Sequence, residues 1–355
     1  MSEILKHYDL VQKIIPRIVL WYRENKIDLP WRCDPTPYHV WISEIMLQQT
    51  RIDAVLSYYA RFLEALPTVS TLAEVEDDRL LKLWQGLGYY SRARNLKKAA
   101  IVVMERYGGV LPSSAEELEK LPGIGSYTAG AIASIAYKKP APAVDGNVLR
   151  VVSRMLASYE DIMQPRVKNE VTQLLRAHYP EGEEASLLTE GLMELGERVC
   201  IPNGTPRCEI CPVKELCLAR SQGIAEELPI RIVKKDKRIE EKTVLVIRSK
   251  TGRFAIRKRA DEGLLSGMWE LVNFDGHGAE GDVEGYLVEK GIRVCSIEAL
   301  LDSKHIFTHI IWQMKGYAVE AEQESPHFVW KTYEEITSEY AIPTAFKHYV
   351  KFMKR

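Results

Sequence analysis

From residue 1 to about residue 220, apolar residues recur at helical spacing in long segments, and turn signals such as EALPTVS and RYGGVLPSS separate these segments. Apolar residues spaced three and four positions apart lie on one face of a helix. No run with the character of a β-strand interrupts this part of the chain. The pattern therefore predicts an all-α domain.

The pattern changes at about residue 243. The stretch TVLVIRSKTGRFAIRKR contains two short apolar runs on either side of a Ser-Lys-Thr-Gly turn, and further strand-like runs follow in SGMWELVNF and QMKGYAVEAE. Helical segments return near residues 332 and 344. We therefore predict an all-α domain over residues 1–223, a basic connector over residues 224–241, and an α+β domain over residues 242–355.

Composition and charge add little to this outline. The chain has 355 residues, 46% of them hydrophobic and 27% charged, which is enough for two ordinary cores. Its net charge of -1 lacks the excess of Lys and Arg that usually marks a nucleic-acid partner. Two local runs are basic: residues 231–259 hold twelve Lys or Arg against three acids, and GLGYYSRARNLKK holds no acid. Each is as consistent with solvated surface as with a binding patch.

Charged residues interrupt every apolar run in the N-terminal stretch MSEILKHYDLVQKIIPRIVLWYRENK. These runs are shorter than a signal peptide core or a membrane-spanning segment requires. We expect a cytoplasmic protein with no membrane partner.

The stretch LPGIGSYTAG, residues 121–130, is a predicted turn between two helices. Ser113 or Ser114 caps the first helix, and the second begins near Ser126. Gly123 and Gly125 permit backbone angles closed to other residues and allow a ligand to approach the main chain. The N–H groups at the start of the second helix favour phosphate, so the hairpin suits a DNA backbone. The alternative is a plain corner between two helices.

Two carboxylic acids stand out in this helical part. Asp145, in KKPAPAVDGNVLRVVSRML, precedes a helix that begins near Gly146, where it is either a simple N-cap or an anion kept ionised by the helix dipole. Glu44 and Gln48 share one face of a helix over residues 38–49, among apolar neighbours. Glu44 is either a solvated surface residue or the acid of a pocket, in which case desolvation raises its pKa.

Four of the six cysteines, Cys200, Cys208, Cys211 and Cys217, have the spacing C-x7-C-x2-C-x5-C. Such density in a reducing compartment favours metal ligation, by zinc or by a 4Fe–4S cluster. We expect Cys33 and Cys295 to be ordinary thiols.

The hairpin followed by a Gly/Pro-rich loop ending in Asp145 resembles the helix-hairpin-helix DNA glycosylase superfamily. Within it, LPWRCDPTPYHVWISEIMLQQTRID and GLGYYSRARNL resemble adenine DNA glycosylases of the MutY family. This resemblance covers nearly the whole chain. It implies a monofunctional enzyme that hydrolyses the N-glycosidic bond of adenine opposite 8-oxoguanine or guanine in duplex DNA, with the enzyme acting as a monomer.

By the same resemblance, Glu44 protonates adenine N7, and Asp145 stabilises the oxocarbenium ion or forms a transient covalent bond. Asn147 and Tyr127 help to hold the sugar. The flipped adenine is enclosed by residues that include Trp31, Leu47, Gln48 and Thr50, while Gln49 and Tyr89 wedge into the vacated space. Related enzymes similar to endonuclease III carry a lysine at the position of Tyr127, which forms a Schiff base and cuts the strand. A phenol cannot form an imine, so no efficient strand cleavage is expected.

The resemblance also favours a 4Fe–4S cluster over zinc, although the family's usual first cysteine spacing is six residues rather than seven. The C-terminal part resembles the family's 8-oxoguanine-sensing domain, which is related in fold to Nudix hydrolases. A Glu-rich metal-binding helix is not evident between residues 263 and 290, so we expect recognition without hydrolysis. The family's Phe-Ser-His signature corresponds to Phe307, Thr308 and His309.

Two rival functions follow from the same motifs. A pyrimidine-excising relative would share the hairpin, the aspartate and the cluster, but Glu44 and the C-terminal domain argue against it. A catalytically silent sensor of DNA damage would use the hairpin and the cluster for binding alone.

Overall fold

The computed structural model describes residues 3–232, 237–260 and 262–354. Residues 233–236 of the predicted basic connector lie outside this description. The chain forms two compact units, one of residues 1–74 and 95–234 and the other of residues 75–94 and 235–355. Among the described residues, no helix has the length and apolar character needed to cross a membrane.

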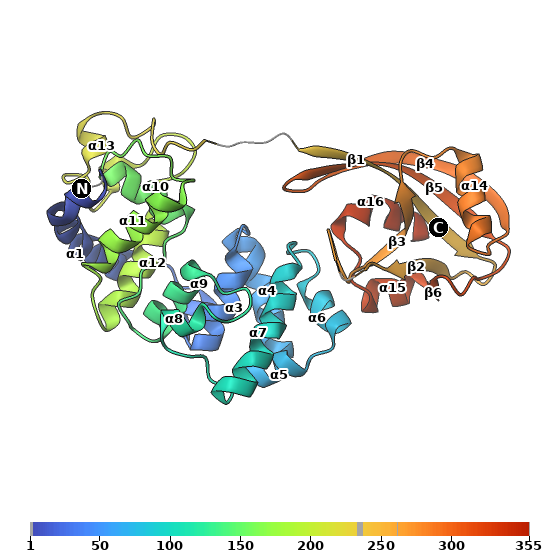
Figure 1. Ribbon diagram of the computed structural model, residues 1–355, viewed down its shortest axis with the longest axis horizontal. Helices are drawn as coiled ribbons and strands as arrows, with labels where there is room; N and C mark the ends of the chain where they lie inside the picture. The colour runs from blue at the N-terminus through green and yellow to red at the C-terminus, as the bar shows by residue number, and fades with distance from the viewer. Residues whose placement is uncertain (1–2, 233–236, 261, 355) are drawn as a thin grey trace. The chain divides into compact units, whose positions relative to one another are not determined.

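The first unit is helical, and its described residues contain no strand (Figure 1). Its α-helices are α1 (Tyr8–Asn25), α2 (Pro30–Cys33), α3 (Pro37–Leu47), α4 (Ile52–Ala65), α5 (Val69–Glu74), α7 (Ser91–Tyr107, which begins in the second unit), α8 (Ala115–Leu118), α9 (Ser126–Ala131), α10 (Gly146–Met155), α11 (Pro165–Arg176), α12 (Glu183–Arg198) and α13 (Leu218–Ser221). A π-helix (Ile132–Ala136) continues α9, and short 3₁₀ helices occur at Leu5–His7 and Cys208–Ile210. The predicted all-α domain is confirmed.

One apolar core holds α1, α10, α11 and α12 together. Its buried members include Ile18 of α1, Val148 and Val151 of α10, and Leu188 and Leu195 of α12. This core fixes α10 against α12, so the N-terminus of α10 and one face of α12 are rigidly placed with respect to each other. The functional pocket described below is built on that pair.

A glycine brings the loop before α10 onto the helix of the hairpin. A Cβ atom on Gly130 would lie 2.3 Å from the carbonyl oxygen of Pro142. Any larger residue would therefore force the loop that ends at Asp145 away from α9. This close approach sets where Asp145 lies relative to the hairpin.

The second unit contains a six-stranded sheet with the order β4-β5-β1-β3-β2-β6, in which β1 and β5 are parallel and the other neighbours are antiparallel. Its elements are α6 (Asp77–Trp84), β1 (Arg238–Ser249), β2 (Phe254–Lys258), β3 (Trp269–Asp275), α14 (Glu280–Glu289), β4 (Val294–Ile306), β5 (Ile310–Ala321), β6 (Val329–Lys331), α15 (Tyr333–Glu339) and α16 (Lys347–Val350), with 3₁₀ helices at Thr344–Phe346 and Lys351–Lys354. The predicted α+β fold is confirmed.

Alternation along β1 gives the sheet two buried faces. Val244 and Val246 pack with residues of α15 and the C-terminal helices, while Leu245 and Ile247 pack with Val283 and other residues of α14. Successive side chains of a strand point to opposite faces, so a run of four apolar residues serves both cores. Helices thus cover both faces of the sheet (Figure 1).

Candidate active site

A pocket of about 700 Å³ in the first unit collects most of the residues predicted for the site. Its lining comes from the loop around α2, from α3 and the turn after it, from the start of α9, from the start of α10, and from α12. The predicted residues in this lining are Trp31, Glu44, Leu47, Gln48, Gln49, Thr50, Tyr127, Asp145 and Asn147. The structure therefore brings into one cavity residues that are up to about a hundred positions apart in the chain.

Glu44 is a buried acid on α3, with only 5% of its surface exposed. The Tyr127 hydroxyl donates a hydrogen bond of 2.7 Å to Glu44 Oε2. Burial raises the pKa of Glu44 to about 7, and the charges of Asp145 and Glu190 act in the same direction. The hydrogen bond from Tyr127 lowers the pKa but does not outweigh burial. A carboxyl group in this state has a proton to give near neutral pH.

Asp145 is the N-cap of α10. Its Oδ1 accepts a hydrogen bond of 2.8 Å from the Val148 amide, and its Oδ2 accepts one of 3.0 Å from Asn147 Nδ2. We expected the helix end to keep this carboxylate ionised. The backbone amides do lower its pKa, but burial outweighs them and the pKa is raised overall. Asp145 is thus both a cap and a pocket residue.

The Asn147 amide is oriented by both of its ends. While Nδ2 donates to Asp145, Oδ1 accepts a hydrogen bond of 3.0 Å from Arg150 Nη2. Arg150 in turn donates to the carbonyl oxygens of Gly196 and Cys200. These bonds hold the end of α10 in place, and they set the direction in which Asn147 faces Asp145.

The structure adds a charged group that the sequence patterns missed. Arg32 lies in the pocket wall, with its Nη2 2.8 Å from Glu194 Oε2 and its Nε 3.5 Å from Glu190 Oε1. The guanidinium lies over the ring of Tyr22 on α1. Glu190 and Glu194 are four residues apart and so lie on one face of α12. This spacing in the sequence could have indicated a pair of neighbouring carboxylates. Nothing in the sequence connects them to Arg32.

The turn after α3 has an unusual backbone. Gln48 Nε2 donates to Thr128 Oγ1 at 3.4 Å, and Gln49 follows with a φ of 57°. Tyr89, in the second unit, has a φ of 47°. Residues other than glycine seldom adopt positive φ, and such strain concentrates at functional sites. Both residues predicted to act as wedges share this conformation.

Both helices of the hairpin begin where predicted, but α8 ends at Leu118, earlier than the predicted stop at Pro122. Ser114 caps α8 by accepting a hydrogen bond from the Glu117 amide, and α9 begins at Ser126. Gly123 has a φ of 76°, and a Cβ atom there would lie 2.5 Å from Asn95 Cβ. Gly125 differs from our expectation, because its φ of -95° and ψ of 176° are open to any residue. Nothing lies within 4 Å of where its Cβ would be, so Gly125 leaves open space at the start of α9.

Phe307, Thr308 and His309 form the turn between β4 and β5 in the second unit. The Phe307 amide donates to the Ile310 carbonyl at 2.8 Å, and its ring packs 4.9 Å from that of Trp312. Thr308 and His309 are exposed. The Thr308 hydroxyl lies 2.6 Å from the hydroxyl of Tyr89. The turn thus presents two polar side chains on an anchored hairpin.

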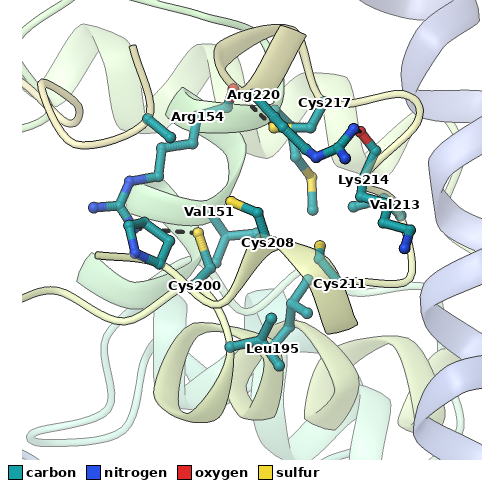
Figure 2. A pocket seen from close by; sticks show the side chains of 14 residues that line it. Val151, Arg154, Leu195, Cys200, Cys208, Cys211, Val213, Lys214, Cys217 and Arg220 are labelled. Atoms are coloured by element: carbon teal, nitrogen blue, oxygen red, sulfur yellow. Dashed lines mark hydrogen bonds between the residues drawn. The ribbon is translucent and has the colours of Figure 1, made fainter. Parts of the chain in front are cut away.

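The four clustered cysteines line one cavity whose other walls are largely apolar, and none of them forms a disulfide. Figure 2 shows the sulfurs of Cys200, Cys208, Cys211 and Cys217 around a shared space. Within the described part of the chain, no three His, Cys, Asp or Glu side chains are close enough to hold one metal ion. A 4Fe–4S cluster needs four thiolates on four separate irons, and so more widely spaced sulfurs than zinc needs. The donor set fits such a cluster.

Comparison with known proteins assigns both parts of the chain to families. Residues 42–177 match the HhH-GPD superfamily of base excision DNA repair proteins, and residues 243–352 match the NUDIX domain. The adenine DNA glycosylase of Buchnera aphidicola subsp. Acyrthosiphon pisum is 31% identical over 321 residues, which is 90% of each chain. That of Homo sapiens is 31% identical over 395 residues, covering 93% of this chain and 72% of the human one.

Solved structures resemble the helical unit in fold. A thermostable thymine-DNA glycosylase is 28% identical, with a TM-score of 0.52 over 59% of this chain and 97% of its own. An endonuclease III–DNA complex is 23% identical, with a TM-score of 0.51 over 63% of this chain and 99% of its own, and shows the likeness of fold alone.

Fold and site together define a base excision DNA repair protein of the helix-hairpin-helix class, joined to a Nudix-like domain. Within that class, the chain belongs to the adenine DNA glycosylase family. The predicted family and the predicted class of enzyme are therefore confirmed.

Proposed function

We propose that this chain is a monofunctional glycosylase that removes adenine mispaired with 8-oxoguanine or guanine in duplex DNA. Its relatives are named adenine DNA glycosylases. The observation that carries the proposal is the buried Glu44, whose pKa is raised to about 7 in a pocket that also holds Asp145. Adenine is a poor leaving group, so its release needs an acid for the base and an anion for the sugar.

Glu44 donates its proton to N7 of the flipped adenine, and the electrons of the glycosidic bond leave with the base. Asp145 faces the positive charge that develops on the deoxyribose, or bonds to it transiently before water attacks. Asn147 orients Asp145 through the hydrogen bond between their side chains. Glu44 thus acts on the leaving base, while Asp145 and Asn147 act on the sugar.

The pocket encloses the flipped base because Trp31, Leu47, Gln48 and Thr50 line it. Gln49 and Tyr89 fill the space that the base leaves in the duplex, and their positive φ angles hold them in exposed turns. Gly123, Gly125 and Ser126 bind a phosphate through backbone N–H groups. No base is read there, in keeping with an enzyme that acts wherever the mispair occurs.

Tyr127 occupies the position at which strand-cleaving relatives use lysine. Its hydroxyl donates a hydrogen bond to Glu44. A tyrosine has no amine, so it cannot form a Schiff base with the sugar. The product is therefore an intact abasic strand. Phe307, Thr308 and His309 read 8-oxoguanine in the opposite strand, and the Nudix-like unit recognises the lesion without hydrolysing a nucleotide.

Cys200, Cys208, Cys211 and Cys217 hold a 4Fe–4S cluster, which cross-links the loop between α12 and α13 beside α10. The group is structural or redox-tuning rather than catalytic when bound, because hydrolysis of a glycosidic bond transfers no electrons. The loop between Cys200 and Cys208 absorbs one residue more than the family's usual spacing.

One assay tests the function. Single-turnover base release is measured on duplexes with A opposite 8-oxoguanine, A opposite G, and T opposite G, with Glu44→Gln as the inactive control. We expect release of adenine from the first two, an abasic product that breaks only on alkali treatment, and little covalent complex trapped by borohydride. Release of thymine alone would favour a pyrimidine-excising enzyme. Binding without turnover would favour a silent sensor, and efficient trapping would contradict the role of Tyr127.

A further inference from the structure

Arg154, in the last turn of α10, reaches the cysteine cavity from the helix that carries Asp145 (Figure 2). Only 3% of its surface is exposed. Its Nη1 donates to Cys200 Sγ at 3.4 Å and to the Ile201 carbonyl at 2.9 Å. Its Nε donates to the Leu228 carbonyl at 2.8 Å. The two carbonyls fix the plane of the guanidinium, and the third bond directs it at one sulfur.

The charge of this guanidinium is not balanced by a carboxylate. Among the described residues, its hydrogen-bond partners are two carbonyl oxygens and one sulfur, and no acid forms an ion pair with it. A buried charge is costly unless it is paired. Four thiolates around an iron–sulfur core carry a net negative charge, so the bound group itself supplies the missing counter-charge.

Arg220 lines the same cavity, but it is partly exposed to solvent and lies near two acids. Its side chain is 32% exposed, and it lies 3.8 Å from Glu209 and 3.7 Å from Glu215. Its charge is therefore shared with acids and screened by water. It offers a matched comparison, since both arginines border the cavity and only Arg154 is dry, without an acid partner, and bonded to a sulfur.

We propose that Arg154 is a positioning residue for the iron–sulfur cluster, holding Cys200 and raising the reduction potential of the cluster. The inference rests on the cluster proposed above. Reduction adds one electron and places more negative charge on the sulfurs. A hydrogen bond to a ligand sulfur and a nearby positive charge stabilise that reduced form, and both act more strongly in a dry site.

The main chain of Arg154 also borders the cavity, because Cys217 Sγ lies 3.5 Å from its carbonyl oxygen. A side-chain substitution leaves this carbonyl in place. Variants at Arg154 therefore report on the guanidinium alone.

The test is protein-film voltammetry of the purified full chain, with iron content and visible absorption measured on the same samples. The electrode supplies or accepts the single electron, and no bond is made or broken. Arg154→Gln should increase the ratio of oxidised to reduced cluster about tenfold at a fixed potential, a fall of about 59 mV for a one-electron couple. Arg154→Lys, which keeps the charge, should show a smaller fall. Arg220→Gln should change the ratio less than about threefold.

The results distinguish failure of the proposed cofactor from failure of the role proposed for Arg154. A wild-type protein without iron overturns the proposed cofactor, and this inference with it. A wild-type protein with iron, but with the same potential in Arg154→Gln, overturns the inference alone, as does an equal fall in Arg220→Gln. If both Arg154 variants fold without iron while Arg220→Gln keeps it, Arg154 serves assembly and the tuning role is wrong.

Discussion

The Tyr127 hydroxyl donates a hydrogen bond of 2.7 Å to Oε2 of Glu44, and this bond opposes the effect of burial on the pKa of the same carboxyl group. Burial disfavours the ionised form, and the hydrogen bond favours it. The two effects leave the pKa at about 7. Tyr127 therefore lowers the pKa of Glu44 below the value that burial alone would give.

The first prediction concerns the pH dependence of base release. Glu44 acts as an acid, so single-turnover release should decline as pH rises through about 7, the pKa of Glu44. Tyr127→Phe removes a bond that lowers this pKa, so the decline should move to higher pH. Rates measured between about pH 5 and pH 9 check this.

Tyr179→Phe is a matched control, because Tyr179 is a buried tyrosine outside the pocket whose hydroxyl lies 2.6 Å from Thr189 Oγ1. It should leave the midpoint unchanged. A midpoint that stays in place or falls in Tyr127→Phe would show that another group controls the profile.

The second prediction concerns stability. Because the pKa of Glu44 is raised in the folded state, folding binds a proton between about pH 4.5 and 7, and the burial cost is felt above that range. A pKa of about 7 in place of 4.5 corresponds to about 3 kcal/mol. Glu44→Gln should stabilise the protein by up to that amount at about pH 8, with little gain at about pH 4.5.

Urea unfolding at the two pH values measures this difference. Glu119→Gln, at an exposed position after α8, serves as control and should show no such dependence. An equal gain at both pH values would mean that Glu44 is not buried in its charged form. The ionisation of Glu44 would then cost the fold nothing, contrary to its burial in the structure.

The third prediction separates the two roles of Asp145. As an N-cap it accepts a hydrogen bond from Val148, which an asparagine also does, whereas alanine loses the cap at a cost of about 1 kcal/mol. Asp145→Asn should therefore keep stability and duplex binding but lose base release by about a hundred- to ten-thousand-fold. Asp145→Ala should lose both stability and base release. Near-normal turnover in Asp145→Asn would reduce this residue to a helix cap.

Local sequence signals were sufficient to predict those features of the site that depend on residues close together in the chain. The cap at Asp145, the start of α9 at Ser126 and the shared face of α3 all follow from helix rules, and the structure brings the two acids into one pocket. The sign of the Asp145 pKa did not follow, because it depends on burial by distant elements. The Arg32–Glu194 pair was missed for the same reason, since it depends on how α12 packs against α1 and α2.

The C-terminal unit shows a similar limit. The sequence pattern did not predict β4, because its apolar residues do not alternate with polar ones. Both faces of this strand are partly exposed, and 73% of the surface of Leu301 is exposed. Residues 75–94 lie in a helical stretch of sequence but belong to the unit that contains the sheet. Gln85 Nε2, for example, donates to the Ile342 carbonyl at 2.8 Å. Contacts across more than 250 positions leave no local pattern.

The fourth prediction concerns the cofactor. The purified protein should be yellow-brown and contain about four irons per chain. Cys208→Ser removes one ligand from the cavity that borders α10, so it should reduce folded yield more than it reduces base release per folded molecule. Cys295→Ser, at an exposed thiol outside the cavity, is the control and should keep colour and yield. A colourless protein with one zinc per chain would exclude the cluster.

The fifth prediction separates lesion reading from chemistry. 8-Oxoguanine carries a hydrogen on N7, which an accepting hydroxyl such as that of Thr308 recognises, and His309 beside it is also exposed. Neither residue lines the adenine pocket, so replacing both with Ala should lower the preference for 8-oxoguanine over guanine while leaving release from the guanine mispair unchanged. A lost hydrogen bond of about 0.5 to 1.5 kcal/mol lowers the preference about threefold to tenfold per contact. Thr308→Ser keeps the hydroxyl and should keep the preference, and Thr337→Ala, on α15, is the control. Full discrimination by the double variant would place lesion reading elsewhere, at the turns of Gln49 and Tyr89.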